Sequence, residues 1–325
     1  MERHGKHNYQ MKVLVVGGLG YIGARVVKHF CQLGHQVSIG SQSSNKIPLV
    51  FSNIKIVNFN LNEVLPFTNQ LKDFELIIHA AGMNSIDCEK NPELAYEYNG
   101  NLTHRILQSA INQGVKRYIY LSTAHVYDSP LIGNYSELSK PNNAHPYALT
   151  HLEGERHILD AHQEKRIQGV VLRISNAFGP PLSPLANCWM LVINDLCLQA
   201  IRFKELGIKS DGTQLRNFIT LSDVINAIDF FSRVSIDKLD NGLFNLGSDF
   251  TTSISDVAKT IAQKAERILK IKPPIVLAKT QASFISPSFS YEINKLKKIG
   301  FILQNKINQE IDDLLLYCKK ENNNI

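Results

Sequence analysis

The sequence lacks the signatures of several protein classes. No apolar run among its 325 residues is long enough to span a membrane, and the most apolar late stretch, residues 189–201, is interrupted by Asn194 and Asp195. The five cysteines are odd in number and scattered, and neither a Cys-x-x-Cys pair nor a His-Glu-x-x-His motif occurs. These absences argue against a disulfide framework and against a metal site. Residues 1–10 contain no apolar signal core, so we expect a flexible extension on a cytoplasmic protein.

Dense charge is also missing. Lysine and arginine total 35 against 29 acidic residues, a formal net charge of +6, but the basic residues are dispersed and no aromatic RNA-binding motif accompanies them. We therefore expect neither a nucleic acid nor a membrane partner, and interpret the excess charge as a basic surface that attracts an anionic small substrate. The length suits one large α/β domain with a smaller lobe.

Residues 11–34 combine an expected strand, a glycine-rich turn and an expected helix. Residues 13–16 are an uninterrupted apolar run, as a doubly buried strand requires, and residues 22–33 carry apolar side chains at helical spacing. Between them the glycines follow G-x-x-G-x-x-G, which lets the backbone approach a pyrophosphate held by N–H groups at the helix start. We expect a dinucleotide site, although tight turns also use glycine for structural reasons alone. Its expected cofactor-binding residues are Gly17, Gly20, Tyr21, Ile22 and Gly23.

The end of the second expected strand, residues 35–39, indicates which dinucleotide binds. Sites selective for NAD usually place a carboxylate there to bind the adenosine ribose. This chain has Gly40 and Ser41 instead, with Lys46 shortly after. Hydroxyls and a lysine can accept a 2′-phosphate, so the sequence favours NADP at least as much as NAD. The alternative is that the serines only decorate a loop.

Two further strands are expected at residues 54–59 and 74–79, and a long helix at residues 92–113. Small residues after the 74–79 strand let a flat cofactor lie close to the backbone, at the edge where open α/β sheets bind ligands. The cofactor-binding residues expected after these strands are Asn60, Leu61, Ala80, Ala81 and Gly82.

A hydroxyl pair and a tyrosine suggest acid/base chemistry. The expected strand 117–121 leads into Ser122 and Thr123, and Tyr147 stands near the start of a later helix. This order suggests proton transfer at a carbinol or carbonyl. A phenol with a pKa of about 10 needs a nearby cation before it can act as a base near neutrality.

Ordered motifs across residues 11–301 resemble one family. They read GGLGYIG, IIHAAG, YLSTAHVY, PYALTHLEGE, VVLRISNAFGP, DGTQLRNFITLSDV and GLFNLGS. The chain resembles the extended short-chain dehydrogenase/reductases, the NAD-dependent epimerase/dehydratase family. The resemblance implies an α/β fold, a Rossmann-type doubly wound parallel sheet with a smaller C-terminal α/β substrate lobe. The implied boundaries are residues 11–180, with 217–246 returning, for the NAD(P)-binding domain, and residues 181–216 and 247–325 for the smaller lobe.

The resemblance implies catalytic roles and exposes a departure. Tyr147 would be the acid/base, and Thr123, with Ser122 as its neighbour, would polarise the substrate oxygen. The family's lysine, which bonds the nicotinamide ribose and lowers the tyrosine pKa, is His151 here. A histidine at i+4 still faces Tyr147 but is only partly cationic at neutral pH. The sequence leaves open an enzyme with a shifted pH optimum, chemistry less dependent on tyrosinate, or a cofactor-binding protein with feeble turnover.

The resemblance also implies a substrate class. Asn176 would contact the substrate; the alternative is that it is only a turn residue at the strand exit. Arg216 would bind a diphosphate; the alternative is that it forms a surface ion pair. A second arginine expected near residues 283–290 is missing, and Ala124 and His125 replace the Asp-Glu of dehydratases. We therefore expect an NAD(P)-dependent nucleotide-sugar epimerase or ketoreductase. We also expect a homodimer through residues 92–113 and 147–162. The alternative is a catalytically weak or inactive dinucleotide-binding sensor or assembly protein.

Overall fold

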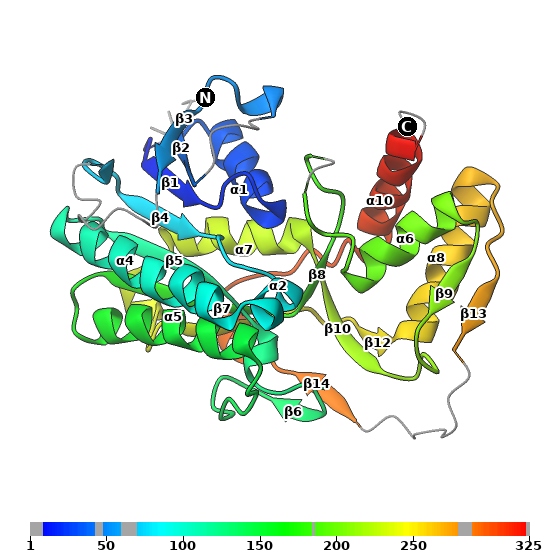
Figure 1. The fold of residues 1–325 in the computed structure, drawn as a ribbon. Helices are drawn as coiled ribbons and strands as arrows, with labels where there is room; N and C mark the ends of the chain where they lie inside the picture. The colour runs from blue at the N-terminus through cyan, green and yellow to red at the C-terminus, as the bar shows by residue number, and fades with distance from the viewer. Residues whose placement is uncertain (1–8, 43–47, 60–69, 184–185, 279–287, 323–325) are drawn as a thin grey trace, which may run out of the picture.

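The computed structural model describes residues 9–42, 48–59, 70–183, 186–278 and 288–322. Its largest element is a parallel sheet of seven strands in the order β11-β7-β5-β4-β1-β2-β3 (Figure 1). These strands are β1 (Lys12–Val16), β2 (Gln36–Ser41), β3 (Lys55–Asn58), β4 (Leu76–His79), β5 (Arg117–Thr123), β7 (Gln168–Ile174) and β11 (Leu243–Leu246). This arrangement confirms the predicted Rossmann-type fold.

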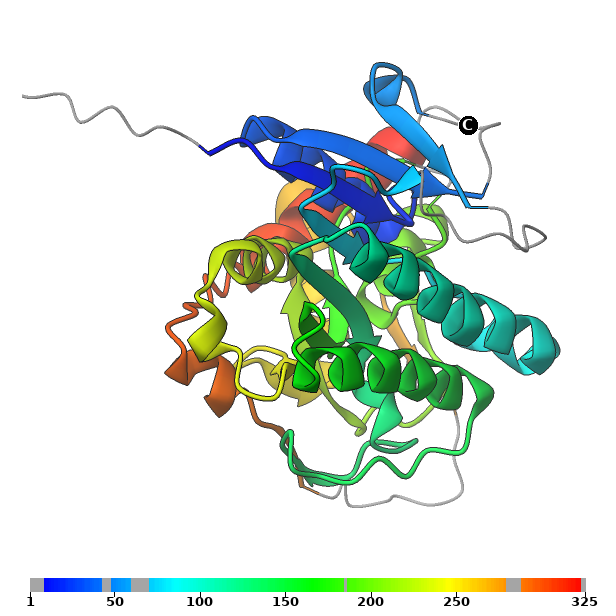
Figure 2. The same ribbon diagram turned by 90° about the vertical axis from the view of Figure 1, so that its left-hand side faces the viewer.

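Alternating side chains of the central strands bury opposite faces of the sheet. Val13 and Val15 join a cluster that includes α1 (Tyr21–Gln32) and α7 (Leu221–Arg233). Leu14 and Val16 join a second cluster, with α4 (Leu102–Asn112) and α5 (Pro146–Gln163). Because a strand points successive side chains to opposite sides, an uninterrupted apolar run is needed to cover both faces. Figure 2 shows α7 in yellow and α4 in teal on opposite sides of the sheet.

The predicted helix 92–113 is a helical run in three parts. It consists of α3 (Pro92–Ala95), a π-helical segment η3 (Tyr96–Asn101) and α4. A π segment adds a residue to the turn and changes which side chains face the neighbouring helix. Before it lies the short helix α2 (Ser85–Lys90).

A second group of elements lies beside the large sheet, at the right in Figure 1. Helices α6 (Val192–Arg202), α8 (Ile254–Leu269) and α10 (Ile307–Asn322) share a third apolar cluster. The small sheets are β12-β10-β8, formed by β8 (Asn176–Phe178), β10 (Leu215–Thr220) and β12 (Thr251–Ser253); β9 (Leu206–Ile208) with β13 (Ile275–Leu277); and β6 (Gly133–Tyr135) with β14 (Phe289–Tyr291). Single-turn segments η1 (Leu49–Phe51), η4 (Ala124–Val126) and η5 (Ile236–Lys238), and the short helix α9 (Asn294–Lys298), complete the described elements.

Side-chain hydrogen bonds fix where two helices begin. Thr220 caps α7, because its hydroxyl accepts from the Asp223 N–H at 3.0 Å. Helix α9 begins at Asn294, because Tyr291 pairs in β14 and its buried hydroxyl donates to the Arg173 carbonyl at 2.7 Å. Within the described ranges, no helix is long and apolar enough to cross a membrane.

Candidate active site

The glycine turn between β1 and α1 has the geometry of a phosphate cradle. Gly17 has φ 78°, and a Cβ on it would lie 2.6 Å from the Ala81 nitrogen, so the turn packs directly on the loop after β4. A Cβ on Gly23 would lie 2.1 Å from the Gly17 oxygen. Helix α1 has Gly20 as its N-cap, no side-chain cap and no acidic residue in its first turn. The N–H groups at Tyr21 and Ile22 therefore begin a helix whose positive end no side chain neutralises, which suits a pyrophosphate.

The remaining predicted cofactor positions are only partly described. Ala80, Ala81 and Gly82 follow β4 as expected, and a Cβ on Gly82 would lie 3.7 Å from His151 Nε2. Ser41 ends β2, and the next residue, Gln42, accepts a hydrogen bond from the Tyr98 hydroxyl. The predicted positions Lys46, Asn60 and Leu61 lie outside the described residues.

Thr123 and Tyr147 meet at the carboxyl end of the sheet. Thr123 is the last residue of β5, and its hydroxyl accepts from the His125 N–H at 3.1 Å. Tyr147 is the second residue of α5 and is hydrogen-bonded to the Thr123 side chain. Burial raises the pKa of Tyr147, and the Thr123 hydrogen bond only partly opposes that effect. The phenol is therefore held in its protonated form.

Ser122 faces the other side of β5. Its hydroxyl donates to Glu155 Oε1 at 2.5 Å, and Glu155 binds the Arg173 guanidinium through both carboxylate oxygens, the shortest contact being 2.6 Å. Glu155 and Arg173 are both buried. Of the two neighbouring hydroxyls, Thr123 is thus the one in contact with Tyr147, while Ser122 is hydrogen-bonded to the buried Glu155–Arg173 ion pair.

His151 lies between Tyr120, which is fully buried, and Tyr147, which is partly buried. Its ring packs edge-on against Tyr147, with centroids 4.6 Å apart, and its Nδ1 lies 3.2 Å from the Tyr120 hydroxyl. Burial lowers the pKa of His151 to about 4, so the imidazole is neutral near pH 7. Within the described part of the chain, no cationic side chain lowers the Tyr147 pKa. Where the family resemblance predicts a lysine cation beside Tyr147, this chain has the neutral imidazole of His151.

Two further polar side chains position the site, and sequence reasoning missed both. Asn99, buried in the π segment, accepts from the Met83 N–H at 2.9 Å and donates to the Thr150 hydroxyl at 3.0 Å. It joins the loop after β4 to helix α5. His145 is the N-cap of α5, and its Nδ1 accepts from the Tyr147 N–H at 3.1 Å. Two sequence features could have identified them. Asn99 is a polar residue inside an apolar helical pattern, and His145 stands two residues before Tyr147.

The predicted substrate residues lie on the neighbouring small sheet. Asn176 begins β8, and its amide donates to the Asn217 carbonyl at 2.9 Å. Arg216 lies on β10 and donates to Gln214 Oε1 at 3.0 Å. Burial lowers the pKa of His125 to about 4, and the charges of Arg216 and His145 contribute. Arg216 therefore acts electrostatically on the segment that follows Thr123.

In the described ranges, no group of three or more His, Cys, Asp or Glu side chains is arranged to bind a metal ion.

Comparison with known proteins places these features in context. The family described as the NAD dependent epimerase/dehydratase family matches residues 13–247. The dTDP-D-glucose 4,6-dehydratase of Dictyostelium discoideum is 24% identical over 276 residues, which cover 77% of this chain and 61% of that protein. The UDP-glucose 4-epimerase of Thermotoga maritima, solved with UDP-glucose, has a TM-score of 0.80 at 21% identity, over 96% of this chain and 99% of that one. The Thermus thermophilus UDP-glucose 4-epimerase complex with NAD has a TM-score of 0.76 at 19% identity, over 95% and 99%.

Proposed function

Because the chain belongs to the NAD-dependent epimerase/dehydratase family, we propose that it is an NAD(P)-dependent nucleotide-sugar epimerase or ketoreductase. A bound nicotinamide would supply or accept a hydride at a sugar carbon. The observation that carries the proposal is the meeting of Thr123, Tyr147 and His151 at the sheet edge where the glycine turn also lies. Parallel strands bring their carboxyl ends together, so cofactor and acid/base groups share that edge.

Each residue has a role set by its chemistry. The Thr123 hydroxyl donates to the substrate oxygen, and Tyr147 transfers the proton of that oxygen. His151 donates to the cofactor ribose through a neutral N–H. Arg216 pairs with the substrate diphosphate, because a guanidinium fork matches two phosphate oxygens. Asn176 contributes a weaker substrate contact from the adjacent strand.

The protonated state of Tyr147 favours ketoreduction over epimerisation. In reduction of a keto sugar, the carbonyl carbon gains a hydride and its oxygen gains the phenol proton, so a neutral phenol is the required form. An epimerase must first remove a proton from a carbinol, which requires phenolate. Burial raises the pKa of Tyr147, and His151 stays neutral beside it. The protonated Tyr147 is thus ready to donate its proton to a keto oxygen, as reduction of a keto sugar requires.

We also propose that NADP is accepted at least as well as NAD. Ser41, not a carboxylate, ends β2, so no charge at that position repels a 2′-phosphate. Titration of the purified protein with NADH and NADPH, followed by nicotinamide fluorescence, measures the two affinities. A strong preference for NADH would contradict this proposal.

We also propose a homodimer through helices α4 and α5. The segment before α4 exposes Leu94 and Tyr96, and α5 exposes Leu149. Exposed apolar side chains on neighbouring helices suit burial against a second copy. Light scattering coupled to size-exclusion chromatography would give the mass of a dimer, and a monomer at all concentrations would contradict the proposal.

Replacing Tyr147 with Phe tests the catalytic assignment. The variant should lose turnover of nucleotide sugars while it keeps the cofactor affinity of the wild type, because only the transferred proton is removed. Tyr96→Phe, which alters an exposed phenol, is the matched control and should keep full activity. Undiminished turnover in Tyr147→Phe would contradict the assignment. Tight dinucleotide binding without turnover in the wild type, across pH 6 to 9, would instead support the sensor alternative.

A further inference from the structure

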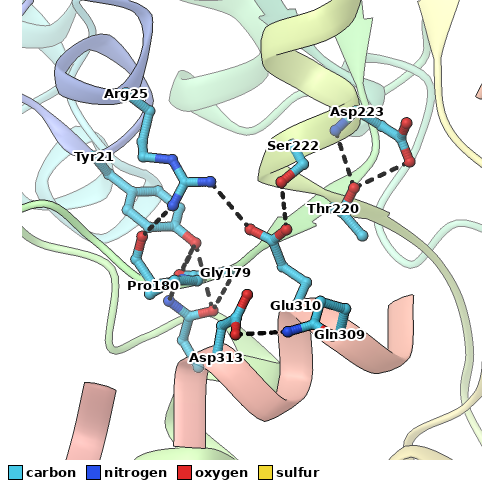
Figure 3. Close-up of polar contacts among 11 residues, drawn as sticks. Tyr21, Arg25, Gly179, Pro180, Thr220, Ser222, Asp223, Gln309, Glu310 and Asp313 are labelled. Atoms are coloured by element: carbon cyan, nitrogen blue, oxygen red, sulfur yellow. Dashed lines mark hydrogen bonds and ion pairs between the residues drawn. The ribbon is translucent and has the colours of Figure 1, made fainter. Parts of the chain in front are cut away.

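Two side chains on α1 connect the glycine turn to the C-terminal part of the chain. Tyr21 and Arg25 are four residues apart and so lie on one face of the helix. The Tyr21 hydroxyl donates to the Gly179 carbonyl at 2.8 Å, and Arg25 Nη1 donates to the Pro180 carbonyl at 3.1 Å. Figure 3 shows Tyr21 directed at Gly179, and Arg25 directed at Pro180 and at Glu310 of α10. Helix α1, which begins at the glycine turn, is thus hydrogen-bonded to the Gly179–Pro180 loop through Tyr21 and Arg25.

Glu310 is the buried centre of these contacts. It is 4% exposed, its Oε2 accepts from the Ser222 hydroxyl at 2.5 Å, and its Oε1 lies 3.4 Å from Arg25 Nη2. Gly179 has φ 147°, and a Cβ on it would lie 2.3 Å from Glu310 Oε1. The loop backbone therefore rests directly on the carboxylate. Through this buried carboxylate α10 contacts α1, α7 and the Gly179 loop, and the partly exposed Arg25 supplies the cation that faces it. Removing Arg25 would leave the buried carboxylate without that cation.

The contact between α10 and α1 is polar, not apolar. The buried apolar side chains of α10, such as Ile311 and Leu314, belong to the cluster shared with α6 and α8. The apolar side chains of α1 and α7 belong to a different cluster. Hydrogen bonds weaken steeply when their angles change, whereas apolar contacts tolerate sliding. A small change in the position of α1 therefore changes how well α10 is held.

We propose that Tyr21, Arg25, Gly179, Pro180 and Glu310 form a latch that couples dinucleotide binding at α1 to the docking of α10. The inference rests on the proposed cofactor site at the start of α1. A ligand that orders this end of α1 also orders the face that carries Tyr21 and Arg25, and so stabilises the latch. By linkage, a docked α10 raises dinucleotide affinity by the same factor. Tyr21, Arg25 and Glu310 act as positioning residues.

Hydrogen exchange of the full chain, with and without NADPH or NADH, tests the latch. The expected result is that the dinucleotide slows amide exchange in both the glycine turn and α10. In Glu310→Gln the slowing in the turn should remain, the slowing in α10 should disappear, and the dinucleotide Kd should rise about fivefold or more, the lower end of typical coupling factors. Gln309→Ala is the matched control, because Gln309 precedes Glu310 but pairs with Asp313 on the exposed side of α10.

Each outcome decides the question. If the wild type binds dinucleotide and exchange in α10 does not change, the latch is overturned while the proposed function stands. If the wild type binds no dinucleotide, both are overturned. If Glu310→Gln does not fold, Tyr21→Phe decides, since it removes only the hydroxyl, which donates to Gly179 and accepts from Asn194. That variant should show reduced slowing in α10, and wild-type behaviour in it would overturn the latch.

Discussion

The Tyr120 hydroxyl lies 3.2 Å from Nδ1 of His151, and both side chains are buried. Burial raises the pKa of Tyr120 well above its ordinary value, so the phenol keeps its proton and can donate it to Nδ1. A neutral imidazole that accepts at Nδ1 carries its proton on Nε2. That nitrogen is the one beside Gly82. We therefore predict that Tyr120 donates to Nδ1 and that the single N–H of His151 lies on Nε2, toward the proposed cofactor site.

Tyr120→Phe removes the hydroxyl that contacts His151 Nδ1, so His151 should then populate both neutral tautomers. Nitrogen NMR of the labelled protein should show His151 mainly as the Nε2–H form in the wild type and as a mixture in the variant. Loss of a hydrogen bond of about 1 kcal/mol predicts roughly fivefold weaker dinucleotide binding. Tyr118→Phe, which removes the hydroxyl that contacts His79 at 2.5 Å, is the control. An unchanged His151 tautomer in Tyr120→Phe would contradict the assignment.

His151→Lys should make Tyr147 a better base. A cation within contact distance lowers a phenol pKa by about 1 to 3 units, so oxidation of a sugar carbinol near pH 7 should speed up about tenfold or more. The measurement is the pH dependence of the oxidative rate, which should shift toward lower pH. His151→Gln adds no charge and should leave the profile in place. Activity that appears only in His151→Lys would support the sensor alternative, and identical profiles would show that no cation reaches Tyr147.

The sequence predicted the fold correctly where residues close together in the chain determine the structure. The apolar run, the glycine spacing and the helix that follows are encoded within residues 11–34, and β1, the turn and α1 form there. Thr123 and Tyr147 lie far apart in the chain. The resemblance to the family suggested that they act together, and in the structure they meet because β5 ends at the carboxyl edge of the sheet, where α5 begins.

The features that the sequence did not reveal depend on tertiary contacts. Tyr120 lies in an apolar strand, where a tyrosine resembles any core residue until His151 is placed against it. Glu310 has the appearance of a surface carboxylate on an amphipathic helix, and only the approach of α1 and Gly179 buries it. The sequence also did not indicate that Ser122 bonds Glu155, which lies 33 residues further along the chain. No local pattern specifies such pairs, because each is fixed by packing between distant segments.

His145→Ala should loosen the start of α5 and displace Tyr147. Nδ1 of His145 accepts from the Tyr147 N–H, so alanine removes the side-chain cap of this helix. Loss of an N-cap costs about 1 kcal/mol of the free energy of unfolding, measured by urea denaturation. His145→Asn supplies another good cap and should restore both stability and turnover. Full stability in His145→Ala would show that this cap contributes little.

Acid should destabilise the fold through two buried neutral histidines. Burial lowers the pKa of His151 to about 4, and burial with the nearby His151 lowers that of His79 to about 3. Histidine in the unfolded chain has a pKa of about 6.5, so below that pH the unfolded state binds more protons than the folded state. The free energy of unfolding therefore falls as pH drops from about 6.5 toward 4, by about 1.4 kcal/mol per pH unit for each histidine.

Urea denaturation at several pH values in this window measures the slope, and His151→Gln isolates one contribution. The variant should lose stability less steeply than the wild type between about pH 6.5 and 4, by the share of one histidine, about 1.4 kcal/mol per pH unit. Above pH 7 the two slopes should agree, because His151 is neutral there in both the folded and the unfolded chain. Equal slopes throughout would mean that His151 takes up a proton in the folded protein, which would remove the basis for a neutral hydrogen-bond donor beside Tyr147.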